Sequence, residues 1–306
     1  MLLTVWDKLK RAGCGICWVS FWSLLLLGLP GGEVSRALAA PSTFQLGTTA
    51  LHQQQYELAI HHFDQTIAQG QHLEESHSYQ CFAWLMLNEP QQAHQSCEMA
   101  VMMNPDHAQA NFYHGLALYR LNRFGAAIAA LDHHLRLHPE DARAYYNCGL
   151  AKFAQGDVSG AIVQYRQALA YGEGLAPVER SNLYNDLGLA YWQSHQSDAA
   201  KLALDQAVLL DQEDIRAHFN RGCICHHRGE YLAALDEFDQ VLRLDSSHAK
   251  TYLNRGLVNQ QMGHRQAAIQ DYRTAVEQFQ QQGELAAAQK AKLRLHQLQR
   301  DRTAVG

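Results

Sequence analysis

Small residues recur along this chain with a period of about 34 residues, and this period restricts the possible folds more than any other feature. One series comprises Gly47, Cys81, Gly115, Gly149, Gly188, Gly222 and Gly256, with equal steps except for a longer one between Gly149 and Gly188. A second series, at a constant offset from the first, comprises Ala59, Ala93, Ala127, Ala161, Ala200, Ala234 and Ala268. Two series that agree over seven units indicate a repeat protein.

The apolar residues around these markers have helical spacing. In the third unit, one set comprises Phe112, Leu116 and Tyr119, and a second comprises Phe124, Ile128, Leu131, Leu135 and Leu137. Pro139 then ends the second helix. Each unit is therefore predicted to be a pair of antiparallel helices, which the small residues allow to approach closely. One pair cannot cover its own apolar faces, so the pairs must stack on one another.

Residues at fixed positions of each unit follow a known family pattern. The matches are Leu187-Gly188-Leu189-Ala190-Tyr191, Tyr231 with Ala234 and Phe238, and Tyr56 with Ala59 and Phe63, with Pro105 and Pro139 at a closing proline position. On these residues the units resemble tetratricopeptide repeats, although Cys81 replaces a glycine and His134 an alanine. The resemblance implies an all-α fold, a right-handed α–α superhelix of seven helix–turn–helix repeats over residues 40–282. The repeats are expected to begin near residues 40, 74, 108, 142, 181, 215 and 249.

Two segments depart from the period. Extra residues fall at 172–177, where Pro177 suits the first turn of the next helix. We expect a lengthened loop between repeats here, and the alternative is a bend that changes the superhelix or contacts a partner. Residues 283–306 are expected to form a C-terminal capping helix and tail, with Leu285, Leu293, Leu295 and Leu298 on its apolar side. A tail that recruits its own partner is the alternative.

Residues 1–39 are typical of a targeting segment. Lys8, Lys10 and Arg11 precede an uncharged stretch at residues 13–29, and Ala37-Leu38-Ala39 supplies a cleavage pattern. This order predicts a secretory signal peptide cleaved before Ala40, with an uncleaved membrane anchor as the alternative. In both cases the positive-inside rule predicts that the repeats are extracytoplasmic. The compartment would be the periplasm or, in a photosynthetic source, the thylakoid lumen.

No residue pattern in the chain predicts catalysis. It contains no G-x-S-x-G, H-E-x-x-H or P-loop motif, so we predict no enzyme and no cofactor. A net charge of −5 argues against nucleic acid as a partner. On a helix, Cys223, His226 and His227 would share one face and could hold zinc or copper, but no fourth ligand is specified. We therefore predict no metal site and keep a His/Cys metal binder as an alternative function.

Five cysteines follow Ala40: Cys81, Cys97, Cys148, Cys223 and Cys225. Cys81 and Cys97 belong to the two helices of one repeat, on the contact seam, and an exported protein can form disulfides. They could form a bridge or could simply be buried small residues. The sequence favours the second interpretation.

Stacked tetratricopeptide repeats form a concave groove lined by the first helix of each pair, so the resemblance implies that the groove binds a protein or peptide. The predicted partner-binding residues are Phe44, Phe82, Phe112, Tyr119, Arg120, Arg143, Tyr146, Phe153, Trp192 and Phe219, with Leu116, His226 and Lys250 on the same face. Aromatic residues and Arg are the types that contribute most at interfaces. The alternative for any single ring is packing between adjacent repeats.

The family's carboxylate clamp for acidic C-terminal peptides is absent, because Thr48, Phe82, Leu116 and Leu150 stand where Asn would be needed. We therefore predict an exported, non-enzymatic scaffold that binds a partner peptide or helix, in assembly or retention of an envelope or membrane complex. The alternative is a structural protein that associates with itself, its groove taking a helix from another copy.

Overall fold

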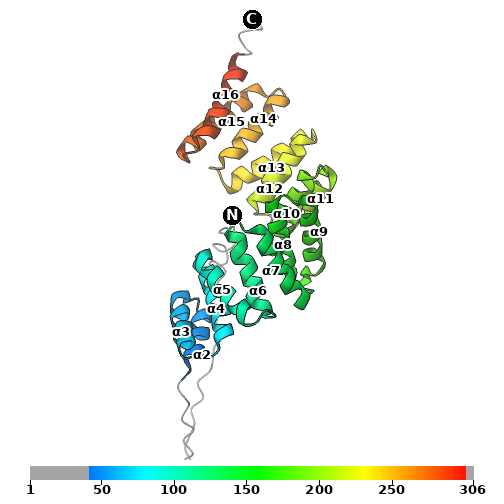
Figure 1. Ribbon diagram of the computed structural model, residues 1–306. Helices are drawn as coiled ribbons and strands as arrows, with labels where there is room; N and C mark the ends of the chain where they lie inside the picture. Colours follow the sequence, from blue (N-terminus) through cyan, green and yellow to red (C-terminus); the bar gives the residue numbers. More distant parts are fainter. Residues whose placement is uncertain (1–40, 301–306) are drawn as a thin grey trace, which may run out of the picture. The chain divides into compact units, whose positions relative to one another are not determined.

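The computed structural model describes residues 41–300, so the predicted targeting segment lies outside the described residues. These residues form fifteen α helices, one short 3-10 helix and no strand. Seven antiparallel helix pairs follow one another in chain order (Figure 1). The first helices are α2 (Thr43–His52), α4 (Leu73–Met86), α6 (Ala108–Arg120), α8 (Ala142–Gln155), α10 (Pro177–Gln193), α12 (Ile215–His227) and α14 (Ala249–Gln261).

The second helices pack against the first. They are α3 (Tyr56–Ala68), α5 (Pro90–Met103), α7 (Phe124–Leu137), α9 (Val158–Ala170), α11 (Ser197–Leu210), α13 (Tyr231–Leu244) and α15 (Arg265–Gln281), and α16 (Leu285–Arg300) follows the last pair. The all-α superhelical repeat fold predicted from the period is confirmed. Within residues 41–300, none of the helices combines the length and apolar character that crossing a membrane requires.

The turn inside each pair places one residue in the left-handed backbone region. Gly156, Gly229 and Gly263 occupy this position with positive φ, as Gly tolerates best. In the other pairs the same position holds Gln54, Asn88, Asn122 and His195, with φ between 58° and 61°. This backbone conformation is strained for residues other than Gly, and the strain is smaller for Asn than for most others. The helix pair therefore imposes the turn even where the local residue opposes it.

Glycines on the first helices let large side chains of the second helices approach closely. A methyl group at Gly149 would lie 2.5 Å from the ring of Tyr165, and one at Gly115 would lie 2.6 Å from Leu131. Both distances are shorter than van der Waals contact. The small-residue series therefore reflects sites where only the backbone fits beneath a bulky neighbour.

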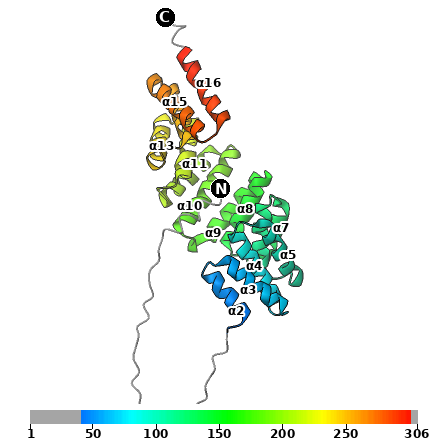
Figure 2. The same cartoon turned by 90° about the vertical axis from the view of Figure 1, so that its left-hand side faces the viewer.

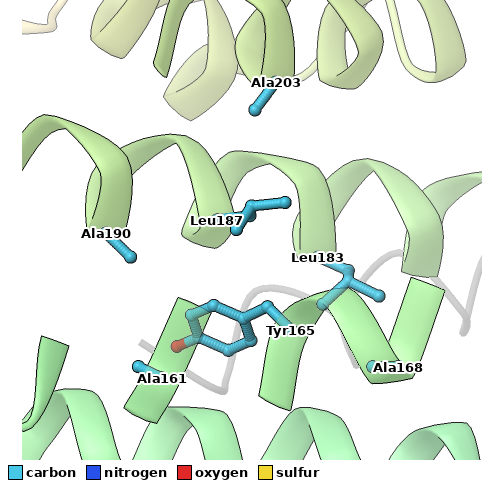
Figure 3. Close-up of a cluster of buried hydrophobic side chains, with 7 residues drawn as sticks. All are labelled: Ala161, Tyr165, Ala168, Leu183, Leu187, Ala190 and Ala203. Atoms are coloured by element: carbon cyan, nitrogen blue, oxygen red, sulfur yellow. The ribbon is translucent and has the colours of Figure 1, made fainter. Parts of the chain in front are cut away.

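The core is continuous from one pair to the next. Figure 3 shows Tyr165 of α9 beneath α10, with Leu183 pointing down towards it, Leu187 at the level of α10, and Ala203 of α11 on the far side of α10. All four side chains are buried. Each pair thus completes the apolar cover of its neighbour, as stacking predicts.

Cys81 of α4 and Cys97 of α5 form a disulfide, with their Cα atoms 5.2 Å apart. The interpretation of these residues as two buried thiols was wrong. Both are buried, but they lie directly opposite each other on the seam between the helices, where a bridge can form.

The longer step between Gly149 and Gly188 extends both the loop and the following helix. A 3-10 turn, η1 (Gly172–Gly174), precedes α10, and α10 begins at Pro177. At 17 residues, α10 is longer than the first helices of the other pairs, which have 10 to 14. The extra residues therefore lengthen the loop before α10 and add a first turn to α10, while the step from the start of α8 to the start of α10 stays close to the regular period.

The last helix, α16, packs against the final pair, but only some of the apolar residues that we expected in this contact are buried. α16 buries Ala288, Ala291 and Leu298. Leu285 and Leu293, which we expected on the covered side, are 71% and 53% exposed. Small alanines make the contact because α16 lies close to α15, and this turns the two leucines outward.

Candidate functional site

The first helices lie on the more tightly curved side of the stack. Helices α4 and α6, and likewise α10 and α12, contact each other as well as their own partners, whereas neighbouring second helices are further apart. Contact between first helices is weakest at α8 and α10, where the longer step of the repeat intervenes. The inner face is therefore least closed between the fourth and fifth pairs.

A hollow of about 830 Å³ opens at this place, and its lining surface is mainly apolar. Its lining residues are Phe153, Leu189, Trp192, Gln193, His195, Ser197 and His227. They come from the C-terminal parts of α8, α10 and α12, from the turn before α11 and from the first residue of α11. Its volume falls within the range of binding pockets, about 300–1,000 Å³. An aromatic-walled hollow with a few polar atoms suits an apolar side chain of a partner.

The rings of this hollow are held in place by their neighbours. Trp192 meets the ring of His227 edge-on, with centroids 4.6 Å apart. Trp192 also packs against the core of Ala200, Leu204 and Ile224, while Phe153 packs against the core of the fourth pair. Both rings stay half-buried. They are thus fixed in orientation while part of each surface remains open.

His195 joins the rim of the hollow from a strained turn. It has φ of 61° at the position where three other pairs have glycine. A non-glycine residue with such a backbone costs of order 1–2 kcal/mol. Gln54, Asn88 and Asn122 have the same backbone in other pairs, and the side chain of His195 is the one of the four that lines this hollow.

A polar cluster lies beside the hollow and bridges the same gap. The hydroxyl of Tyr146 on α8 donates a 2.6 Å hydrogen bond to Oδ2 of Asp186 on α10. Arg216 on α12 approaches Asp186 at 3.9 Å and donates a 3.1 Å hydrogen bond to Asn182. Burial raises the pKa of Asp186, although the charge of Arg216 and the hydroxyl of Tyr146 act in the opposite direction. Side chains therefore link first helices whose backbones stay apart.

Two asparagines extend this cluster along the inner face. The Asn220 amide donates a 2.9 Å hydrogen bond to Asn185, and the Asn185 amide donates one of 3.3 Å to Asp186. The sequence prediction omitted Asp186 and Asn220, since it followed only some positions of each first helix. Asp186 and Asn220 occupy the same position in consecutive units. They would have been found if this position had been compared in all units of the repeat.

The structure brings only some of the predicted binding residues together. Phe153 and Trp192 share the hollow, and Tyr146 lies in the adjoining polar cluster. Phe112 is 6% exposed and packs among Leu131, Leu135 and Cys148. It belongs to the core between repeats, which was the stated alternative for a single ring.

The remaining predicted aromatics contact neighbours at other repeats. Phe44 stacks on His72, with centroids 4.4 Å apart, and Phe82 lies 5.1 Å from Tyr113. Tyr119 lies 5.8 Å from Phe124, and Phe219 lies 5.2 Å from His248. Phe44, Phe82, Tyr119 and Phe219 are half-buried and lie outside the hollow.

The two predicted arginines have different surroundings. Arg120 is half-buried and donates to the carbonyl oxygen of Leu85, so its guanidinium links the second and third pairs. Arg143 is exposed, pairs with Asp141 at 3.5 Å and lies 5.6 Å from the ring centroid of Phe112. Of the two, Arg143 has the guanidinium open to a partner.

Cys223, His226 and His227 do not converge. His226 hydrogen-bonds Gln261 at 2.8 Å, His227 faces Trp192, and Cys223 accepts a 3.7 Å hydrogen bond from Asn254. Burial raises the pKa of the Cys223 thiol to about 12, which disfavours the thiolate that binds metals. In the part of the chain that is described, no three His, Cys, Asp or Glu side chains are grouped so that they could hold a metal ion.

The stacked pairs and the hollow of their inner face define a class, the helical-repeat scaffolds for protein–protein contact. Family models described as tetratricopeptide repeat match residues 85–137, 114–177, 185–249 and 249–282. The chain belongs to the tetratricopeptide-repeat family. Proteins of this family are generally non-enzymatic scaffolds for protein interaction.

One curated relative is the photosystem I assembly protein Ycf3 of Acaryochloris marina. It is 31% identical over 101 residues, which are 32% of this chain and span 60% of the relative's length. Among solved structures, the tetratricopeptide-repeat protein YrrB, described as having an unusual peptide-binding site, is 25% identical. It aligns with a TM-score of 0.54 over 65% of this chain and 98% of its own.

A second solved structure, pilF of Pseudomonas aeruginosa, is 17% identical. It aligns with a TM-score of 0.61 over 72% of this chain and 97% of its own. At this identity the likeness concerns the fold.

Proposed function

We propose that this protein is a non-enzymatic scaffold that binds a peptide or helix of a partner protein on its inner face, centred on the hollow at the fourth and fifth pairs. The observation that carries the proposal is the half-open aromatic wall formed by Phe153 and Trp192. Fixed aromatic rings in a hollow contribute strongly to binding because they lose little conformational entropy when a partner arrives. An apolar side chain of the partner would enter the hollow.

The polar cluster would fix the direction of the bound segment. Asn182, Asn220 and Arg216 present amide and guanidinium groups beside the hollow. Such groups can hydrogen-bond the backbone of an extended segment or the polar side of a helix. A segment with one apolar anchor and flanking polar residues therefore suits this surface best. The peptide-binding site described for YrrB supports this kind of ligand.

We further propose that the protein acts outside the cytoplasm, in assembly or retention of an envelope or membrane complex. Three observations support this proposal: the targeting pattern of residues 1–39, the Cys81–Cys97 disulfide and the assembly protein among the relatives. Disulfides persist mainly in oxidising compartments such as the periplasm. Cell fractionation with N-terminal sequencing of the natural protein tests the location, and a cytosolic protein that begins at Met1 would contradict it.

Crosslinking and affinity capture from membranes test the inner face. We expect Trp192→Ala to reduce recovery of the specific partner about tenfold or more, as loss of a hot-spot aromatic does. Leu202→Ala is the control, because Leu202 is a large apolar residue that is exposed on α11 outside the hollow. Ser197→Phe would fill the hollow without deleting any core atom. Unchanged partner recovery by folded Trp192→Ala and Ser197→Phe would contradict the assignment.

A further inference from the structure

Charge is unevenly distributed along the stack of helices. Residues 41–119, which form α2 to α5 and α6 up to its last residue Arg120, contain no Lys or Arg, and their acidic residues are Glu57, Asp64, Glu74, Glu75, Glu89, Glu98 and Asp106. Residues 249–300, which form α14 to α16, carry eight Lys and Arg against three acidic residues. With histidine neutral, the formal charges are −7 and +5. The stack is therefore acidic at its first end and basic at its last.

The basic end has an exposed face with both charge and apolar surface. Helix α16 contains no acidic residue, and its Lys290, Lys292 and Arg294 are exposed. Leu285 and Leu293 are exposed on the same helix. Terminal repeats normally close a stack with a polar outer side, so two exposed leucines there indicate a contact surface.

The acidic end is an open stacking face. Thr49 on α2 is exposed, whereas Ala83, Ala117 and Ala151, at the corresponding positions of the next three pairs, are completely buried. Those alanines are covered because another pair precedes them, and no described pair precedes α2. Leu46 on α2 is 37% exposed, whereas Gln80 and Cys148 at the corresponding positions of later pairs are buried. Leu58 on α3 is 44% exposed, and its equivalents Ala126 and Ala267 are exposed as well. The exposed Glu57 lies next to Leu58.

The two ends lie at opposite limits of the chain of helix pairs, as both views show (Figures 1 and 2). We propose that α16 of one copy of this protein docks on α2 and α3 of a second copy, head to tail. The leucines of the two ends would pack together, and the opposite charges would set the orientation of the encounter. Such a contact joins two different surfaces, so it can continue into a chain of copies.

The test uses two populations of the full-length protein that carry different affinity tags after Gly306. Capture of one tag should retain the other copy at low ionic strength, and salt that screens charges beyond about 10 Å should weaken retention. We expect Lys290→Glu with Arg294→Glu to lower retention about tenfold. Arg166→Glu with Arg243→Glu is the control, since both arginines are exposed and the change in net charge is identical. Retention by the control should match that of the unmodified protein.

A charge exchange makes the test specific to this contact. Copies with Glu57→Lys and Gln65→Lys, both exposed on α3, should again retain copies with Lys290→Glu and Arg294→Glu. The proposal is overturned if unmodified copies do not retain each other, if the α16 variant is retained normally, or if the exchange restores nothing. If the variant with Lys290→Glu and Arg294→Glu no longer binds anionic phospholipid vesicles but is still retained by unmodified copies, this face of α16 binds a lipid surface instead of a second copy. Trp192→Ala should leave retention unchanged, which separates this contact from partner binding in the hollow.

Discussion

Cys81 and Cys97 are 16 residues apart and form a disulfide at the place where other repeats pair a glycine with a bulky residue. The same spacing separates Gly149 from Tyr165 and Gly115 from Leu131, whose side chains approach the glycines closely. In the second repeat, one small residue has become larger and one large residue smaller, so the pair still fills the seam. The disulfide thus replaces a packing contact by a covalent one.

Removal of the disulfide should destabilise the protein. For Cys81→Ala with Cys97→Ala we expect a loss of about 3 kcal/mol in the free energy of unfolding, because the unfolded chain regains the entropy of an open loop. Cys81→Gly with Cys97→Leu recreates the pair of the third repeat and should recover part of that loss. Denaturant unfolding with and without a thiol reductant measures both effects. Equal stability of the unmodified protein under the two conditions would contradict the prediction.

Substitution by alanine should destabilise the protein at a glycine packed under a bulky side chain and stabilise it at a helical glycine with free space around it. Gly149→Ala forces a methyl group against Tyr165 and should cost about 1–3 kcal/mol, the usual result of overpacking. Gly125→Ala on α7 meets only Gln155, at 3.8 Å, so the better helix propensity of alanine should stabilise the protein by up to about 1 kcal/mol. Thermal unfolding of the two variants tests this prediction. A change of the unfolding temperature in the same direction for both would refute the packing argument.

His195 should combine a cost in stability with a benefit in binding. His195→Gly relieves the left-handed backbone and should raise the free energy of unfolding by about 1 kcal/mol, while partner capture falls because the rim of the hollow is lost. Gln54→Gly relieves the same strain in the first repeat, away from the hollow, and should leave capture unchanged. Calorimetry and affinity capture on both variants separate the two effects. Improved stability with normal capture for His195→Gly would restrict His195 to a turn residue.

Asp141 should make stability depend on pH in the acid range. It caps α8 by accepting a 2.9 Å hydrogen bond from the amide of Arg143, and a hydrogen bond from His134 holds the pKa of its carboxyl well below the ordinary value of 3.8. A carboxyl whose pKa is lowered by folding stabilises the protein above that ordinary value and loses this contribution as the pH falls through the folded pKa. Asp141→Asn keeps the cap but removes the charge.

The free energy of unfolding of the unmodified protein should therefore decline more between pH 5 and pH 2 than that of Asp141→Asn, by about 1–2 kcal/mol. Urea unfolding at several pH values provides the comparison. Parallel pH profiles for the two proteins would show that the carboxyl has no lowered pKa.

The hydrogen bond between Tyr146 of α8 and Asp186 of α10 should depend more on an acceptor oxygen at position 186 than on a negative charge there. Asp186→Ala leaves the hydroxyl of Tyr146 without its partner and should cost about 1–3 kcal/mol. Asp186→Asn keeps one acceptor oxygen for Tyr146 but turns an amide NH2 towards Asn185 and removes the charge that faces Arg216, so it should cost less than Asp186→Ala without being neutral. A larger loss for Asp186→Asn than for Asp186→Ala in chemical denaturation would overturn this account.

The fold could be predicted because its determinants are local and periodic. Gly149 and Ala161 have equivalents on the seam between the two helices of every unit. The weak pattern of one unit therefore becomes a strong one when it recurs seven times. The site could be predicted only in part. Phe153 and Trp192 were identified by position in the repeat, but the same rule chose Phe112, which neighbouring side chains bury. Position in a repeat gives the direction of a side chain and not the depth at which its neighbours cover it.

The sequence by itself determined the helix pairs, their number and their stacking, since the apolar period leaves each pair no other way to cover its surface. Only the tertiary structure decided that Cys81 meets Cys97, that α8 and α10 leave a hollow, and that Leu285 and Leu293 of α16 point outward. These features depend on how closely particular helices approach. That separation is set by all the side chains at a contact together, and no single position in the sequence specifies it.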